Sequence, residues 1–293
     1  MTTDLIAELE RRTVLVDGAM GTMLIDAGLA PGTPPERWVL ERPDDVLAVH
    51  RAYARAGAEV LTTCTFGANR FHLERAGLAL RIREVIHAAV SIAKEASEGR
   101  RWIMGDIGPI WSPPSQAETP SPSGRRDAYA EQAHGLVSAG CDVLLIETMT
   151  DLDEALLALS AARAPGAPVI VTMSFAPEDE TAPPESVAAR LVEAGAAAVG
   201  VNCWRNAEQM LPVVTRMAAA SGVPVIARPN AGQPRRNADD RLVYDETPER
   251  FAAGIARIVA AGARAVGGCC GTTPEMIAAA RRAIDVTRGR AGA

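Results

Sequence analysis

The stretch AGCDVLLIET, residues 139–148, joins a turn to one particular kind of strand. Residues 143–146 are all apolar, without the polar alternation of a strand that has one face in water. Such a run is typical of a parallel strand covered on both faces, and the glycine before it is typical of a helix end. The same joint, a glycine between small residues ahead of a strand, recurs at Gly57, Gly195 and Gly262. The chain is therefore expected to repeat one helix–turn–strand unit.

Eight runs of this kind are predicted as strands. They span residues 13–18, 58–63, 101–107, 141–148, 168–174, 197–202, 223–230 and 264–268, with helical segments between them. Eight β–α units predict an α/β fold, a single-domain (β/α)8 or TIM barrel covering residues 1–293. A doubly wound open sheet is the alternative. The first strand, however, runs into DGAMGTM, which lacks the G-x-G-x-x-G loop typical of that fold.

Composition and charge exclude several classes of function. The net charge of −6 argues against a nucleic-acid partner, which would favour a basic surface. No apolar run approaches the ~20 residues of a membrane-spanning helix, and the first residues lack the pattern of a signal peptide. A cytoplasmic protein is expected, with cysteines that are metal ligands, nucleophiles or core residues rather than disulfides. The sequence leaves the oligomeric state open.

Two long segments without periodicity follow the third and the seventh predicted strand. They span residues 109–126 and 229–246, the first rich in Pro and Ser. In a barrel both would be loops at the carboxyl ends of the strands, here called the mouth, where barrel active sites lie. Either loop could dock a partner or close over a small ligand.

Three cysteines are predicted to meet at the mouth. Cys203 follows the sixth strand, and Cys269 and Cys270 follow the eighth. Even-numbered strands contribute side chains to the same layers of a barrel, so three thiolates are expected to share one zinc ion. Neighbouring side chains in a regular strand point to opposite faces. Gly267, Gly268 and Gly271 are therefore expected to let the backbone turn. The helix start expected at Thr272–Pro274 would aim unpaired backbone N–H groups at the mouth, where they favour clustered thiolates.

The other candidate ligands are weaker. A strained disulfide between Cys269 and Cys270 is the rival interpretation of the cysteine pair. Cys141 begins a strand at the opposite end and is interpreted as a core residue, whereas Cys64 lies at the mouth without a partner in the sequence. The four histidines are expected on helices away from the mouth. They are His50, His72, His87 and His134.

Three protein thiolates leave one tetrahedral position open, which is typical of a catalytic zinc. A soft fourth ligand is expected, and a substrate thiol bound there would stay deprotonated at neutral pH. The predicted chemistry is alkyl transfer to that thiol. The only lysine, Lys94, lies on a predicted helix, which excludes a Schiff-base mechanism at the mouth.

Further residues at the predicted mouth suit an amino-acid thiol. Glu147 ends an apolar strand, where it would meet either a substrate ammonium or a nearby arginine. Asp17 ends the first strand, and Gly18 after it would offer backbone N–H groups to a carboxylate. The remaining hydrogen-bonding candidates are Thr62, Thr63 and Asn202.

Six segments together resemble the homocysteine S-methyltransferase family, which includes betaine-dependent, S-methylmethionine-dependent and cobalamin-dependent members. They are DGAMGT at 17–22, TTCTFGAN at 62–69, IET at 146–148, GVNC at 200–203, PNAG at 229–232 and GGCCGTTPE at 267–275. The resemblance implies a (β/α)8 barrel, zinc on Cys203, Cys269 and Cys270, and homocysteine thiolate as the substrate ligand. It also implies that Glu147, with Asp17, holds the substrate ammonium, and that the N–H groups around Gly18 and Ala19 take its carboxylate.

The methyl donor is left open by the resemblance. Betaine-using relatives carry tyrosines where this chain has Gly67 and Thr148, which disfavours an aromatic cage for a quaternary ammonium. The donors considered are a methyl-corrinoid or methylcobalamin, S-methylmethionine and betaine. The chain is expected to lack folate and cobalamin modules, so a corrinoid would come from a separate protein. Two alternatives remain: a zinc methyltransferase for another thiol or a selenol, and a non-catalytic barrel that binds zinc or homocysteine.

Overall fold

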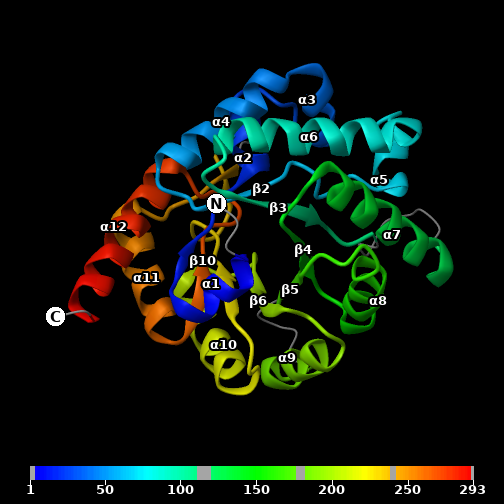
Figure 1. Ribbon diagram of the computed structural model, residues 1–293. Helices are drawn as coiled ribbons and strands as arrows, with labels where there is room; N and C mark the ends of the chain where they lie inside the picture. Colours follow the sequence, from blue (N-terminus) through cyan, green and yellow to red (C-terminus); the bar gives the residue numbers. More distant parts are fainter. Residues whose placement is uncertain (1–3, 111–119, 176–181, 238–241, 292–293) are drawn as a thin grey trace.

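The computed structural model describes residues 4–110, 120–175, 182–237 and 242–291 (Figure 1). Eight parallel strands form its inner wall, and all eight predicted strands are confirmed. They are β1 Val14–Leu15, β2 Val60–Thr62, β3 Trp102–Ile107, β4 Val143–Met149, β5 Val169–Met173, β6 Ala198–Asn202, β7 Val225–Arg228 and β10 Ala263–Val266. Their order is β1-β10-β7-β6-β5-β4-β3-β2. A parallel bridge from Val16 to Val60 joins the two ends of the sheet, which closes the barrel.

Helices surround this wall (Figure 1). They are α1 Leu5–Arg11, α2 Met20–Asp26, α3 Glu36–Glu41, α4 Pro43–Arg55, α5 Arg70–Arg75, α6 Ile82–Ser97, α7 Pro122–Ala139, α8 Leu152–Ala162, α9 Pro184–Glu193, α10 Ala207–Ala220, α11 Pro248–Ala260 and α12 Pro274–Ala291, with a 3₁₀ turn at Ala79–Arg81. The glycine joints behave as expected, because Gly57, Gly140, Gly195 and Gly262 all have φ between 93° and 110°. Only glycine adopts this conformation without strain, so each joint ends its helix and starts the next strand.

The two long loops differ in part from expectation. Within residues 109–126, α7 already begins at Pro122 because the Ser121 hydroxyl accepts a hydrogen bond from the N–H of Gly124 and caps the helix. Residues 111–119 lie outside the described part. Within residues 229–246, Arg235–Arg236 (β8) and Leu242–Val243 (β9) pair as an antiparallel hairpin that the sequence analysis did not predict. The short, polar first strand gives little periodic signal.

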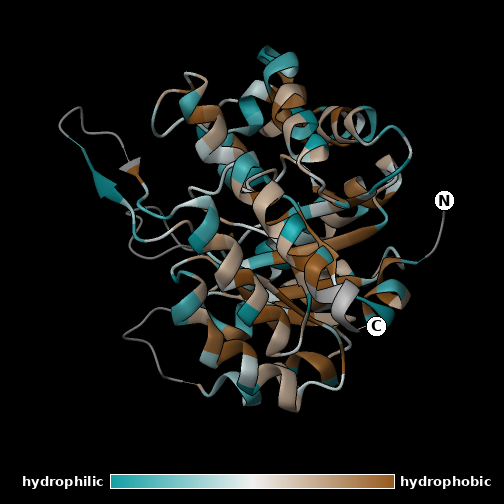
Figure 2. Cartoon of the chain, turned by 90° about the vertical axis from the view of Figure 1, so that its left-hand side faces the viewer, coloured by the Kyte–Doolittle hydropathy of each residue, from teal (hydrophilic) through white to brown (hydrophobic). Residues whose placement is uncertain are grey.

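The barrel interior is filled in layers. The lower layer is apolar and includes Val60, Met104, Leu145 and Ile226, with Leu5 and Leu9 of α1 packed beneath it. A second, larger apolar cluster lies between the strands and the outer helices. Figure 2 shows hydrophobic residues gathered on the strands and hydrophilic residues outside them. The fold therefore rests on cores below and around the mouth.

A polar layer lies directly above the apolar interior. Because side chains alternate along a strand, the residue two positions later points into the same space. Each residue of the polar layer lies two or four positions after an apolar interior residue of the same strand. The pairs are Val60 and Thr62, Met104 and Asp106, Leu145 and Glu147, Ala198 and Asn202, and Ile226 and Arg228. All five are buried. Within the described segments, no helix is both long and apolar enough to span a membrane.

His50 on α4 gives a testable pH dependence of stability. Its side chain is fully buried, neither ring nitrogen has a partner, and burial lowers its pKa to about 4. Since the unfolded chain takes up this proton near pH 6.5, stability is complete above that pH and is lost as pH falls toward 4. His50→Leu is expected to gain about 2 kcal/mol of unfolding free energy relative to wild type on going from pH 7.5 to pH 5.

Urea unfolding of both proteins at the two pH values measures this difference. His134→Leu, on the exposed side of α7, is the matched control and should show no such change between pH values. An unchanged difference for His50→Leu would show that the imidazole is charged or solvated in the folded protein.

Candidate active site

Cys203, Cys269 and Cys270 form a triangle of thiols at the mouth. The Cys203 and Cys270 sulfurs are 3.9 Å apart, those of Cys269 and Cys270 are 4.0 Å apart, and all three lie within 4.8 Å of one another. Cys269 and Cys270 are separate thiols, not a disulfide. Among the described residues this is the one cluster of three or more His, Cys, Asp or Glu side chains arranged to hold a metal ion.

The triangle fits the geometry of zinc. Sulfurs at ~2.3 Å from one tetrahedral ion are ~3.8 Å apart, close to the separations observed. The neighbouring thiols of Cys269 and Cys270 lower the pKa of Cys203, while the contact with Cys203 raises the pKa of the other two. The thiols therefore already compete for protons, and a bound cation would resolve that competition.

Strained backbone brings the sulfurs together. Cys203 and Trp204 have φ of 61° and 54°, and Thr148 at the end of β4 has 62°. Non-glycine residues adopt this conformation at a cost of ~1–3 kcal/mol, and such strain clusters at functional sites. After β10, Gly271 has φ 78° and lets the chain turn, as expected.

Gly267 and Gly268 serve a different purpose from the one predicted. Neither has a positive φ. Instead, a Cβ on Gly267 would lie 2.6 Å from the Asp17 carbonyl oxygen, and one on Gly268 would lie 2.3 Å from the Thr272 hydroxyl. These glycines allow close packing of the strand end against its neighbours rather than a turn.

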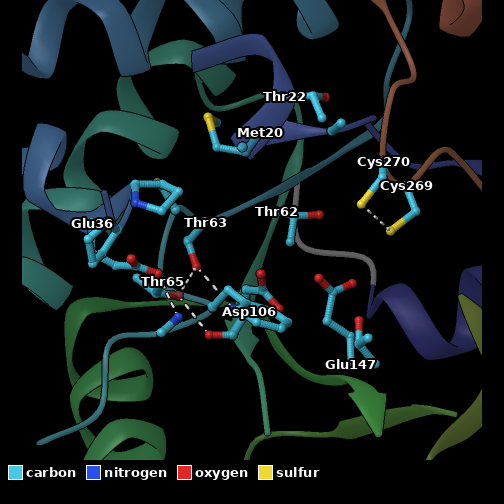
Figure 3. Close-up of a pocket in the computed structure, with 18 of the residues that line it drawn as sticks. Met20, Thr22, Glu36, Thr62, Thr63, Thr65, Asp106, Glu147, Cys269 and Cys270 are labelled. Carbon is cyan, nitrogen blue, oxygen red and sulfur yellow. Dashed lines mark hydrogen bonds between the residues drawn. The ribbon is translucent and has the colours of Figure 1, made fainter. Parts of the chain in front are cut away.

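A cavity of about 600 Å³ opens beside the thiols (Figure 3). Its lining includes all three cysteines and the predicted residues Gly18, Ala19, Thr62, Thr63 and Glu147. The predicted residues Asp17 and Asn202 lie behind the lining: Asn202 accepts hydrogen bonds from the Thr148 N–H at 2.9 Å and from the Thr172 hydroxyl at 2.8 Å. The Ala19 N–H donates to the Thr272 hydroxyl at 3.0 Å, so it is already engaged.

Arg228 links two of the predicted acids. Its guanidinium donates to Glu147 Oε2 at 2.9 Å and to Asp17 Oδ1 at 3.2 Å, and its Nε donates to the Gly268 carbonyl at 3.2 Å. The Cys203 N–H also donates to the Arg228 carbonyl at 3.2 Å. Arg228 is buried, with 4% of its surface exposed. It connects the two acids to both segments that carry the thiols, through Gly268 next to Cys269 and through the N–H of Cys203. An arginine was one of the two partners expected for Glu147, and the structure identifies it as Arg228.

Burial has the largest effect on the pKa values of the acids in this layer. It raises the pKa of Glu147 to about 7 and that of Asp17 to about 6, in both cases against the opposing effect of Arg228. Burial and then the charge of Glu147 raise the pKa of Asp106 well above its usual range. Burial lowers the pKa of Arg228, but Glu147 and Asp17 outweigh it and the net shift is upward. The arginine thus stays charged and stabilises the carboxylates.

Several lining residues were missed. Asp106 and Arg228 lie on the inward-facing side of β3 and β7. Because side chains alternate along a strand, counting every second residue of these strands would have predicted this position. Glu36 on α3 accepts a hydrogen bond from the Gly67 N–H at 2.6 Å, a contact between segments that no local pattern indicates. His72 also lines the cavity, which corrects its predicted place away from the mouth. The short helix α5, which carries it, borders the cavity.

The remaining predicted side chains are placed as follows. Cys64 is buried and lines the cavity outside the thiol triangle, and Cys141 is buried at the start of β4. Among the described lining residues, Phe66 is the one Phe, Tyr or Trp. Trp204 is half exposed at the rim, Tyr244 packs over Gly271, and Trp111 lies outside the described residues.

The chain is similar to proteins of one known family. Residues 14–284 match the family model described as homocysteine S-methyltransferase. The chain is 32% identical over 313 residues to methionine synthase of Mycobacterium leprae (strain TN), covering 97% of this chain and 26% of that protein. It is 31% identical over 299 residues to methionine synthase of Mycobacterium tuberculosis (strain ATCC 25618 / H37Rv), covering 94% of this chain and 25% of that protein. The chain therefore spans about a quarter of the length of these relatives.

A solved structure covers nearly the same span. The crystal structure of the homocysteine methyltransferase MmuM from Escherichia coli, in its metallated form, superposes with a TM-score of 0.79 at 26% identity. The match covers 96% of this chain and 99% of that one. The barrel predicted from the sequence is thus matched over nearly its whole length by a solved protein.

Proposed function

The chain belongs to the homocysteine S-methyltransferase family, and we propose that it methylates homocysteine to methionine with zinc on Cys203, Cys269 and Cys270. The observation that carries this proposal is the thiol triangle opening into a cavity lined by Glu147. A bound zinc would supply a position where the acceptor thiol stays deprotonated at neutral pH. The acceptor sulfur forms a bond to the methyl carbon as the bond from methyl to donor breaks, and the donor leaves with that electron pair.

The chain's own residues position the acceptor. Glu147 faces the cavity and suits the ammonium group, while backbone N–H groups near Gly18 suit the carboxylate. Thr62 fixes Asp17 by two hydrogen bonds of 2.6 and 2.7 Å, and Asn202 fixes the strained Thr148. Strain and buried hydrogen bonds together preorganise the site, which lowers the entropy cost of aligning sulfur and donor.

The donor is best sought with a panel. Phe66 alone among the described aromatic side chains lines the cavity, which disfavours a cage for betaine. The match to two proteins named methionine synthase supports methyl transfer to homocysteine and is compatible with a methyl-corrinoid donor. We expect methionine to form from homocysteine with methylcobalamin or a methylated corrinoid protein. Efficient turnover with S-methylmethionine or betaine alone would contradict delivery by a partner.

The alternatives differ in outcome on the same panel. Faster methylation of another thiol or of a selenol would replace homocysteine as the acceptor. Tight homocysteine binding without turnover on any donor would favour the non-catalytic barrel. Residues 1–293 are proposed to form a single-domain (β/α)8 barrel. A cytoplasmic location is proposed because the thiols need reducing conditions to bind a metal.

A further inference from the structure

The thiol triangle poses a problem of selectivity. Three protein sulfurs lie beside the cavity into which the acceptor sulfur would enter, yet only the acceptor sulfur is to be methylated. Thiolates are strong nucleophiles, so a methyl donor could also alkylate the protein. The protein sulfurs therefore have to be less reactive than the acceptor, and their hydrogen-bond partners decide how reactive they are.

Tyr244 covers the sulfur of Cys270. It follows β9 and is half-buried against the core. Its hydroxyl forms a hydrogen bond with the Cys270 sulfur, and its ring lies over Gly271, where an added Cβ would come within 2.2 Å of the ring. A tyrosine hydroxyl is protonated at neutral pH, so toward a thiolate it can act only as the donor. Gly271 thus leaves room for a donor directly beside the sulfur.

Backbone hydrogen bonds hold Tyr244 in this place. The Glu246 N–H donates to the Ala231 carbonyl at 3.2 Å, and the Ala231 N–H donates to the Cys270 carbonyl at 3.0 Å. Ala231 is fully buried. The segment that carries Tyr244 is therefore tied through one residue to the segment that carries Cys270, so the contact is built into the mouth.

The other two sulfurs have donors of their own. The backbone N–H of Trp204 forms a hydrogen bond with the Cys203 sulfur, at the point where both residues have positive φ. The Asn202 side chain donates from Nδ2 toward the Cys269 sulfur at 3.8 Å. Each of the three protein sulfurs thus accepts a hydrogen bond from a neighbouring N–H or O–H group.

We propose that these donors, above all Tyr244, direct methyl transfer to the acceptor sulfur by weakening the protein thiolates as nucleophiles. The inference rests on the zinc site of the proposed function. A hydrogen bond draws charge from a thiolate, and nucleophilicity falls as basicity falls. The acceptor sulfur enters from the cavity and takes no share in these three contacts. Tyr244 acts through Cys270 and is therefore a positioning residue.

Alkylation of zinc-loaded Tyr244→Phe by methyl iodide, without homocysteine, tests this proposal. A reacting thiolate forms a bond to the methyl carbon as iodide leaves with the electron pair, and peptide fragmentation in a mass spectrometer shows which sulfur has reacted. Loss of a charge-assisted hydrogen bond raises the basicity of the sulfur, and about half of that rise appears in the rate. Cys270 is therefore expected to react roughly 3- to 10-fold faster than in wild type.

The phenylalanine keeps the ring over Gly271, so the access of methyl iodide to the sulfur stays the same. Cys203 and Cys269 keep their donors and should react as in wild type. Tyr129→Phe, on α7, is the matched control because it removes a hydroxyl that donates to Glu154 at 2.6 Å. All three sulfurs of this control should react at wild-type rates.

Each outcome decides the proposal. An unchanged rate at Cys270 in Tyr244→Phe would overturn it. Equal acceleration at all three sulfurs would overturn it too, because that result indicates an opened site or lost metal. Zinc content is measured before each reaction, and wild type that binds no zinc would overturn both this inference and the proposed metal site. Zinc-loaded wild type that transfers no methyl group to homocysteine would overturn the proposed reaction, with the alkylation result still deciding the role of Tyr244.

Discussion

Cys203→Ala is expected to lose nearly all of its bound zinc, while wild type carries about one ion per chain. The variant keeps only two zinc ligands, Cys269 and Cys270. A catalytic zinc is normally held by three protein ligands, with the fourth position left open. Methyl transfer should fall to background, because the acceptor thiol would no longer be held as a thiolate. Metal analysis after dialysis and a methionine assay measure the two effects.

Cys64→Ala is the matched control for this experiment. Cys64 lines the same cavity and is 4% exposed, but it lies outside the thiol triangle. This variant should keep its zinc. Full zinc and normal activity in Cys203→Ala would remove the thiol triangle as the metal site.

Loss of zinc should leave the barrel folded. The three cysteines follow the ends of β6 and β10, above the apolar layer and away from the cluster between strands and helices. Thermal unfolding of Cys203→Ala should therefore match that of metal-free wild type. Collapse of the fold in the variant alone would show that the thiols also stabilise the barrel.

The barrel and the thiols were predictable because their signals are local. Buried parallel strands such as residues 143–146 are recognisable as apolar runs. The glycine-rich motif GGCCGT at residues 267–272 indicates where the last strand ends and so places two cysteines there. Asp106 and Arg228 carried a signal too, since each continues the inward face of its strand by two residues. A carboxylate or guanidinium ending an apolar strand is a candidate for the mouth for that reason.

The partners of these residues were not predictable. Arg228 meets Glu147 from 81 positions away and Asp17 from 211 positions away. In the sheet β7 lies two places from β1 and three places from β4, so those contacts arise only when the curved sheet brings side chains together across the barrel interior. His72 was misplaced for a similar reason: its helix is short, and only tertiary packing brings it beside the cavity.

Arg228→Met should destabilise the protein strongly, because it leaves Asp17 and Glu147 buried without their cation. Breaking a buried ion pair by removing one partner costs about 3–5 kcal/mol, most of it from the charge left behind. Arg228→Lys should recover part of this loss, since it keeps the charge but not the fork that reaches two acids. Urea unfolding of the zinc-loaded proteins measures the free energies.

Arg216→Met provides the matched control. Arg216 contacts Glu185 at 2.7 and 3.0 Å, as close as the contacts of Arg228, but the side chains of Arg216 and Glu185 are 48% and 40% exposed. Water screens this pair, so its loss should change the unfolding free energy far less than the loss of Arg228 does. Equal effects of the two substitutions would mean that Asp17 and Glu147 are uncharged in the folded protein. In that case Glu147 could not attract an ammonium group before binding, and the acceptor would have to be recognised through its sulfur and carboxylate instead.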